Sequence, residues 1–292
     1  MERFMTISTV RQWQMSDGGS LGFVPTMGAL HSGHLALIHQ SLVDNERTIV
    51  SIYVNPLQFS PTEDFTSYPR FLEDDCSILE GLGVDALFLP DDAHIYPPGF
   101  STSVEVTGSL TQRLEAVSRP DHFRGVTTIV TKLMQVIHAN RTYFGMKDAQ
   151  QLLVLGKLVR DLAIPTKVIP VPTVRDSDGL ALSSRNRYLS KDERLTALAI
   201  PRALTVASRL YEQGEKEAVV LRNAMIEELD RESGVYQDYA ACVSIDSLAD
   251  LETIEGPALL AVAGSVGGVH LIDNHWLGTT RDSMVDFFND PC

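Results

Sequence analysis

A glycine-punctuated turn between an apolar run and an amphipathic segment constrains the fold of this chain more than any other feature of its sequence. Residues 21–24 have the composition of a buried strand, and the apolar residues after residue 34 recur at helical spacing. The turn between them, from Val24 to His34, would therefore lie at the N-terminus of a helix. Backbone N–H groups and the positive end of the helix dipole favour bound anions there. We interpret this turn as a phosphate-binding site.

Two histidines of the turn are candidate catalytic groups. His31 and His34 are three residues apart and would share one face of the first helical turn, where imidazole donors can meet a polyphosphate. A metal site is one alternative, but no cysteine lies nearby to complete a zinc set. A structural pair, with one histidine capping the turn, is another. The glycines on both sides, Gly28 and Gly33, argue for a ligand because they let it approach the backbone closely.

Composition narrows the class of protein. With 292 residues, 44% hydrophobic content and mean hydropathy near zero, the chain can bury substantial cores and divide into two domains. A net charge of −14 disfavours nucleic acid and anionic membranes as partners. Residues 1–15 lack a sustained apolar segment, so we expect no signal peptide. Three widely spaced cysteines fit a reducing compartment, and we expect a cytoplasmic protein.

Apolar patterning predicts an α/β fold for the first part of the chain. The candidate strands are residues 21–24, 49–54, 86–89, 141–144 and 166–169, and the candidate helices are residues 32–45, 72–82, 127–138 and 149–162. This alternation predicts a Rossmann-like, mostly parallel sheet flanked by helices. Ligands of such folds bind at the carboxyl ends of the strands, where the turns after Val24, Val54 and Phe144 would meet.

The remainder of the chain predicts a smaller α+β domain. A proline-spaced stretch ends near residue 174, so we place a catalytic domain at residues 1–175 and a lid domain at residues 176–292. The second domain would contain helices at residues 191–211 and 218–229, a strand at residues 241–245, and a glycine-broken pair of strands within residues 259–272. That apolar pair is too short and too interrupted for a membrane span. We expect the tail from residue 282 to be peripheral.

Two further segments carry polar side chains suited to substrate binding. The turn at residues 53–59 offers Asn55 and Gln58, whose amides can fix hydroxyls or carboxylates directionally. Residues 143–151 supply Lys147 as a cation for phosphate and Asp148 as a carboxylate for ribose hydroxyls. Ordinary surface turns and a solvated lysine are the alternatives for these segments.

Two basic segments are the remaining candidates for anion binding. Arg119 and His122 lie just ahead of an apolar helix, as at an anion-facing helix start. Residues 178–190 place Ser183, Ser184 and Arg185 in a loop that can close over phosphate as mobile lids do. The sequence contains no Gly-x-Gly-x-x-Gly, Walker or Gly-x-Ser-x-Gly motif, which argues against dinucleotide, P-loop and serine-hydrolase sites.

Taken in order, these motifs resemble those of the pantoate–β-alanine ligases, a family of His-x-Gly-His nucleotidyltransferases. The matching segments are residues 25–34, 54–59, 68–70, 122–126, 144–151, 182–189 and 271–274. The resemblance implies an ATP-dependent ligation in two steps. Pantoate attacks the α-phosphorus of ATP to give pantoyl adenylate and pyrophosphate, and β-alanine then displaces AMP to give pantothenate. Adenylation is needed because AMP is a far better leaving group than oxide, and the site must position reactants and neutralise charge.

The resemblance also implies roles for individual residues. His34 would be the proton donor, with His31 beside it on phosphate; Lys147 and Arg185 complete the catalytic set. The implied ATP-binding residues are Met27, Gly28, Ala29, Leu30, His31, Ser32, Gly33, His34, Gly145, Met146, Lys147, Asp148, Val174 (through its backbone), Leu182, Ser183, Ser184 and Arg185. Gln58 and Gln151 would hold pantoate, with Asn55 in the same substrate group. Mg²⁺ would bridge the ATP phosphates, with Asp74 as protein ligand, and the family is usually a cytoplasmic homodimer.

Two departures from the family pattern and two other functions stay open. Met146 stands where glutamate is usual, and Asp121 stands where a small residue is usual and could weaken anion attraction near His122. A nucleotidyltransferase that makes a dinucleotide-type product would share the histidine turn without needing both Gln58 and Gln151. A non-catalytic nucleotide-binding protein is the other alternative. The presence of His34, Lys147 and Arg185 argues against it.

Overall fold

The computed structural model describes residues 1–16, 18–60, 63 and 65–290, and the chain divides into two compact units. The first unit comprises Met1–Met146, Gln150–Val171 and Val285–Cys292. The second comprises Lys147–Ala149 and Pro172–Met284. Within the described residues no helix has the length and apolar content that crossing a bilayer requires.

The first unit is built on a parallel sheet, as the sequence predicts. Among its described residues the strand order is β1-β4-β3-β2-β5-β6, and every neighbouring pair is parallel. The strands are β1 (Glu2–Phe4), β2 (Leu21–Thr26), β3 (Arg47–Ile52), β4 (Ala86–Phe88), β5 (Arg141–Gly145) and β6 (Lys167–Val171). Except in the short strand β1, their central positions are apolar and buried, which is typical of a sheet covered on both faces. The predicted α/β class is confirmed. Strand β1 was not predicted from the sequence.

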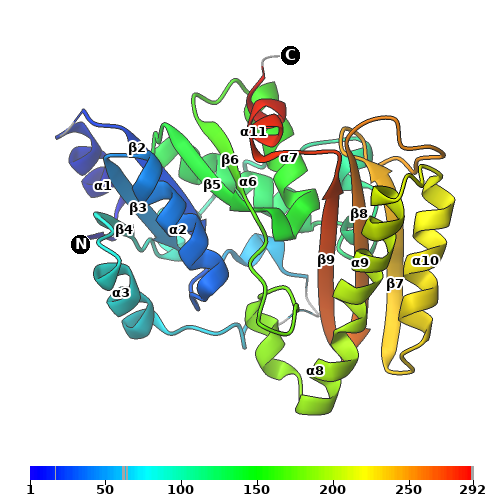
Figure 1. Ribbon diagram of the computed structural model, residues 1–292. Coiled ribbons are helices and arrows are strands. Elements are labelled where there is room, and N and C mark those ends of the chain that lie inside the picture. The colour runs from blue at the N-terminus through cyan, green and yellow to red at the C-terminus, as the bar shows by residue number, and fades with distance from the viewer. Residues whose placement is uncertain (17, 61–62, 64, 291–292) are drawn as a thin grey trace. The chain divides into compact units, whose positions relative to one another are not determined.

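Helices connect the strands of this sheet, and the last helix of the chain, α11, joins them (Figure 1). They are α1 (Ile7–Met15), α2 (Ser32–Asp44), α3 (Leu72–Gly81), α4 (Asp92–Ile95), α5 (Glu115–Ser118), α6 (His122–Val136), α7 (Ala149–Asp161) and α11 (Arg281–Asn289), with 3-10 turns η1 (Pro56–Gln58), η2 (Ser109–Thr111) and η3 (Met146–Asp148). One core cluster joins Val24, Val50 and Leu87 of the sheet to Ile38 of α2 and Leu79 of α3. The apolar faces of the helices therefore cover the strands that carry the candidate motifs.

The C-terminal tail is not peripheral, so that prediction was wrong. Phe288 of α11 is fully buried, and a Cβ atom added to Gly156 of α7 would collide with its ring. The Asn289 amide accepts from the Val168 N–H and donates to the Val168 carbonyl, both at 2.8 Å. The last helix thus packs on α7 and satisfies a backbone pair of the edge strand β6.

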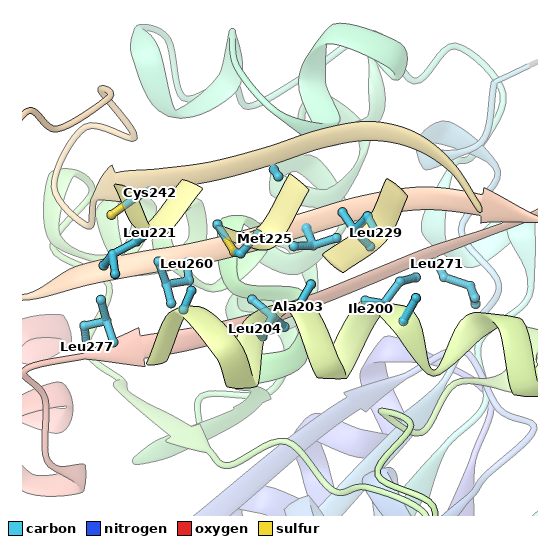
Figure 2. Packing of buried hydrophobic residues seen from close by; sticks show 14 of the residues in the cluster. Ile200, Ala203, Leu204, Leu221, Met225, Leu229, Cys242, Leu260, Leu271 and Leu277 are labelled. Atoms are coloured by element: carbon cyan, nitrogen blue, oxygen red, sulfur yellow. The ribbon is translucent and has the colours of Figure 1, made fainter. Parts of the chain in front are cut away.

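The second unit is a small α+β structure, as predicted. Strands β7 (Val235–Ser244), β8 (Ala258–Val266) and β9 (Val269–Leu277) form an antiparallel sheet, joined by helices α8 (Lys191–Ala197), α9 (Ala199–Glu212), α10 (Ala218–Asp230) and the 3-10 turn η4 (Ser184–Tyr188). Figure 2 shows Leu204 of α9 and Met225 of α10 packed with Leu260 of the sheet. Gly267 and Gly268, both at positive φ, form the tight turn expected between β8 and β9.

One helix prediction in this unit fails in detail. The segment expected as one helix at residues 191–211 is divided into α8 and α9 at Leu198. Pro201 stands in the first turn of α9, where its missing N–H has no helical partner to lose. The proline therefore fits a new helix start better than the interior of a continuous helix.

Candidate functional site

Two of the predicted motifs and the start of a third meet at one edge of the first unit's sheet. Strands β3, β2 and β5 are neighbours and run in the same direction, so their carboxyl ends lie side by side (Figure 1). The histidine turn follows β2, the turn with Asn55 and Gln58 follows β3, and Gly145 ends β5. The convergence expected from the sequence is present for these segments.

The turn after β2 has an unusual backbone that a buried carboxylate holds. Gly28 (φ +80°) and Ala29 (φ +51°) are both left-handed, a conformation that costs energy at alanine. Asp75 of α3, only 2% exposed, accepts hydrogen bonds from the N–H groups of Ala29 (2.9 Å) and Leu30 (2.8 Å). The protein's own carboxylate thus occupies the backbone N–H groups of two residues that the family resemblance assigns to ATP.

Asp75 is a site residue that sequence reasoning missed. It is one of three consecutive acidic residues in the first turn of α3, with Glu73 and the exposed Asp74. Such a run is typical of a solvated helix start, where negative charge suits the helix dipole. Only the tertiary contact distinguishes Asp75 from its two neighbours.

The two histidines form a reciprocal cap at the start of α2. His31 is the N-cap residue; its Nδ1 accepts from the Gly33 N–H (3.1 Å), and His34 Nδ1 accepts from the His31 N–H (3.3 Å). A Cβ atom on Gly33 would come within 2.9 Å of the His31 ring, which explains that glycine. The ring centroids are 4.1 Å apart. Because each Nδ1 accepts, each neutral ring carries its proton on Nε2 and can donate it.

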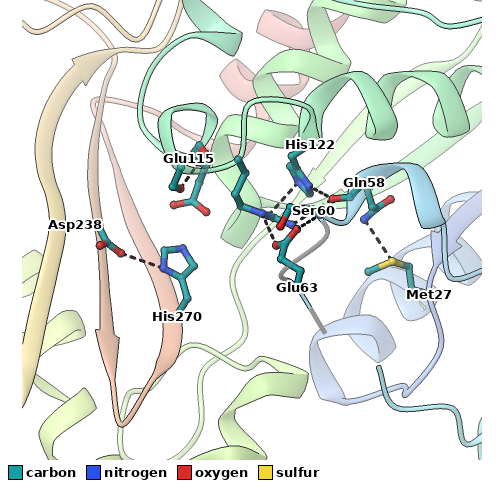
Figure 3. A network of polar contacts seen from close by, with 10 residues as sticks. Met27, Gln58, Ser60, Glu63, Glu115, His122, Asp238 and His270 are labelled. Carbon is teal, nitrogen blue, oxygen red and sulfur yellow. Dashed lines mark hydrogen bonds and ion pairs between the residues drawn. The ribbon is translucent and has the colours of Figure 1, made fainter. Parts of the chain in front are cut away.

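Asn55 and Gln58 are joined by a hydrogen bond. Asn55 is 1% exposed, and its Nδ2 donates to Gln58 Oε1 at 3.0 Å and to the Gly125 carbonyl at 3.2 Å. Gln58 Nε2 lies 3.4 Å from the sulfur of Met27 in the histidine turn (Figure 3). A Cβ atom on Gly125 would collide with the backbone of Leu57 and Gln58. The start of α6 therefore packs directly on the turn that carries Gln58.

Basic residues ahead of α6 hold the same turn. His122 Nδ1 lies 2.8 Å from the Gln58 carbonyl oxygen (Figure 3). Arg119 Nε lies 2.7 Å from Glu63 Oε1. Burial raises the pKa of Glu63, but the Ser60 N–H and the Arg119 guanidinium outweigh it and hold that pKa below its ordinary value. This segment, expected to face an anion, makes its observed contacts to the Gln58 turn and Glu63.

The other predicted nucleotide segments belong to the second unit. Lys147 Nζ lies 3.4 Å from Asp148 Oδ1, and Asn274 of β9 donates to the Lys147 carbonyl at 2.7 Å. The Val174 carbonyl accepts from the Leu182 N–H at 3.0 Å, which ties the start of the predicted closing loop to Val174, the residue expected to bind ATP through its backbone.

A side-chain cap orders the closing loop, and an ion pair holds the segment just before it. Ser183 Oγ accepts from the Arg185 N–H at 3.2 Å and caps η4. Arg175 makes two bonds to the buried Asp273, at 2.6 and 2.9 Å. Asp273 and Asn274 lie in the family-matching segment 271–274, but no role was predicted for them from the sequence.

The remaining candidates are Gln151 and Asp74. Gln151 is partly buried in the first turn of α7. Asp74 is exposed on α3, and in the described part of the chain no group of three His, Cys, Asp or Glu side chains is gathered as a metal site.

A parallel α/β sheet whose carboxyl edge carries a histidine turn at a helix start defines a class of α/β proteins that bind anionic ligands at that edge. Within that class, the family model described as pantoate-beta-alanine ligase matches residues 2–276. The chain belongs to the pantoate–β-alanine ligase family, and it is an enzyme of the ligase type.

Individual relatives agree over nearly the whole chain. The pantothenate synthetase of Moorella thermoacetica is 49% identical, covering 94% of this chain and 98% of that protein. A pantothenate synthetase structure from Thermus thermophilus superposes with a TM-score of 0.91 at 44% identity, over 94% of this chain and 99% of that one. The Francisella tularensis pantoate–β-alanine ligase, determined in complex with beta-gamma ATP and β-alanine, gives a TM-score of 0.77 at 35% identity, over 96% and 99%.

Proposed function

We propose that this chain ligates pantoate and β-alanine to pantothenate through a pantoyl-adenylate intermediate and releases AMP and pyrophosphate. Membership of the ligase family over residues 2–276 supports the overall reaction. The observation that carries the chemistry is the reciprocal cap of His31 and His34, because it aims two Nε2–H donors from a helix start that favours anions.

In the first step the pantoate carboxylate is the nucleophile, so no protein base is needed to activate it. The demand on the protein is to hold the carboxylate near the α-phosphorus and to stabilise the charge that develops on the phosphate oxygens. We assign His34 as the principal donor to phosphate and His31 as its neighbour, both through Nε2–H. Lys147 supplies a positive charge to phosphate, and Arg185 does so from the closing loop.

In the second step the β-alanine amine attacks the acyl carbon and AMP leaves. Gln58 and Gln151 orient the pantoyl group, since amides fix oxygen substituents directionally without adding charge. Gln58 also borders the β-alanine position. We assign Ser183 and Ser184 to the phosphates and Asp148 to the ribose.

The residues present fit a magnesium ion that is held mainly by ATP. Mg²⁺ commonly binds through one or two carboxylates together with substrate phosphates. Asp74 is an exposed single carboxylate, whereas both oxygens of Asp75 already accept backbone N–H groups. We propose Asp74 as the protein ligand; the ion, when bound, neutralises phosphate charge.

The assembly and the division of labour are further parts of the proposal. We propose residues 1–175 as the catalytic domain, residues 176–292 as the lid domain, and a cytoplasmic homodimer as the working form. The proline-spaced stretch that ends near residue 174 supports the division into domains, and the widely spaced cysteines together with the family resemblance support the compartment. The homodimer is carried by family resemblance alone.

The test is the pattern of products from ATP and Mg²⁺ with pantoate, with and without β-alanine. Pyrophosphate release should require pantoate, AMP turnover should require β-alanine, and His34→Ala should lower both by orders of magnitude. The control is His39→Ala, an exposed histidine on the same helix. If the protein binds ATP but releases neither product in any mixture, it is a non-catalytic nucleotide-binding protein.

A further inference from the structure

The amide of Asn55 has a fixed orientation because the main chain determines it. Its Oδ1 accepts from the Leu57 N–H (3.3 Å), and its Nδ2 donates to the Gly125 carbonyl (3.2 Å). Reversing this amide would place a donor against a donor and an acceptor against an acceptor. The second Nδ2 hydrogen therefore points to Gln58 Oε1, 3.0 Å away.

Tyr96 completes the chain of bonds on the other side of Asn55. Its hydroxyl lies 2.7 Å from Asn55 Oδ1, which as an acceptor requires the tyrosine to donate. Burial and the nearby Asp92 carboxylate raise the pKa of Tyr96, so the phenol keeps its proton. The Tyr96 ring packs on the Phe100 ring, with the ring centroids 5.0 Å apart. Lys132 Nζ donates a hydrogen bond to the Ile95 carbonyl and so holds the main chain next to Tyr96.

We propose that Tyr96 and Asn55 are positioning residues that fix the polarity of the Gln58 amide, so that this glutamine offers only N–H donors to the substrate. The inference rests on the proposed function and specifies what Gln58 recognises, namely an oxygen acceptor such as a carboxylate, and not a hydroxyl proton. Both lone pairs of Asn55 Oδ1 and both Nδ2 hydrogens are used within the protein. Asn55 therefore acts through Gln58 and does not itself contact substrate.

The N–H donors of the Gln58 side chain can bind a substrate oxygen without giving up a strong hydrogen bond. The neighbour of Nε2 is the thioether sulfur of Met27, at 3.4 Å, which is a weak acceptor. A substrate oxygen, especially an ionised one, is a much stronger acceptor and would replace it on binding. The hydrogen bond from His122 holds the backbone carbonyl of Gln58 in place, so the Gln58 side chain extends from a fixed backbone position.

The test compares two neighbouring tyrosines whose hydroxyls bond to different partners. Tyr96→Phe removes the hydroxyl that orients Asn55, whereas Tyr53→Phe removes a hydroxyl that donates to Asp92 instead. We expect Tyr96→Phe to raise the KM for pantoate about three- to tenfold, the loss of one neutral hydrogen bond. The KM for ATP and the Tm should change no more than in Tyr53→Phe.

Asn55→Asp gives the stronger perturbation. An aspartate offers only acceptors, so the Gln58 amide should reverse to donate to it and present its oxygen to the substrate. We expect the KM for pantoate to rise more than tenfold, with the KM for ATP within about threefold of wild type. Equal effects of the two tyrosine variants, or an unchanged pantoate KM in Asn55→Asp, would overturn the inference. A wild-type enzyme that releases no pyrophosphate with pantoate would instead overturn the proposed function.

Discussion

Replacing Asp75 by asparagine should damage ATP binding although Asp75 is not expected to touch ATP. The wild-type carboxylate accepts one N–H on each oxygen, from Ala29 and Leu30. Asparagine keeps one acceptor and turns its NH₂ group against the other N–H. The change therefore removes one charge-assisted hydrogen bond and leaves a buried donor unsatisfied.

The magnitude follows from those two bonds. A hydrogen bond to a charged group contributes about 1.5–3 kcal/mol, and an unsatisfied buried donor costs about 1–3 kcal/mol. Allowing for relaxation of the turn, we expect a loss of about 2–4 kcal/mol. Since about 1.4 kcal/mol is a factor of ten, the KM for ATP should rise about ten- to hundredfold, with part of the loss expressed as a lower Tm.

The assay is pantoate-dependent pyrophosphate release as a function of ATP, together with thermal unfolding. Glu73→Gln is the matched control, because it removes an exposed acidic side chain from the same helical turn. Ala29→Gly in the Asp75→Asn background should recover part of the loss, because glycine adopts the left-handed conformation without a Cβ penalty. An ATP KM for Asp75→Asn equal to that of Glu73→Gln would refute the reasoning.

Three further predictions concern the Gln58 turn and its surroundings. Gly125→Ala forces a methyl group against the backbone of Leu57 and Gln58. We expect the free energy of unfolding, measured with urea, to fall by about 1–3 kcal/mol and the KM for pantoate to rise. An unchanged stability and an unchanged KM would contradict this packing. The pKa of Glu63 is lowered in the folded protein, so its ionised form stabilises the fold fully above the ordinary pKa of 4.5, and this stability is lost as the pH falls through the lowered pKa. The difference in unfolding free energy between wild type and Glu63→Gln should therefore shrink in acid. A difference that stays constant with pH would show that Arg119 does not stabilise the Glu63 charge. Asp121→Asn removes an exposed ion pair and should alter at least one Michaelis constant while stability stays within about 1 kcal/mol; identical Michaelis constants would contradict it.

Local sequence predicted those parts of the fold whose signal is local. The strand β2 is a continuous apolar run, and α2 has a clear helical stripe, so both were placed to within two residues of their ends. Strand β1 is three residues long with the sequence Glu-Arg-Phe, and its pairing with β4 alone makes it a strand. Helix α11 was missed because its burial depends on the gap that Gly156 leaves for Phe288, far away in the chain.

The candidate site divides in the same way. Motifs located the histidine turn and the glutamine turn, because residue type and spacing carry that information. Hydrogen-bond direction is not written in a motif. The amide polarity of Gln58, through Asn55 and Tyr96, and the use of Asp75 by the turn depend on partners brought in by tertiary structure. The proton on Nε2 of His34 follows instead from a local hydrogen bond within the cap, whose geometry the motif does not state.

The most direct test of the account is exchange of labelled pyrophosphate into ATP without β-alanine. A reversible first step that forms pantoyl adenylate predicts exchange that requires pantoate, proceeds in the absence of β-alanine and is lost in His34→Ala. Product formation with β-alanine but no exchange without it would contradict an adenylate formed in a separate first step. Exchange that proceeds equally well without pantoate would contradict pantoate as the group that attacks ATP.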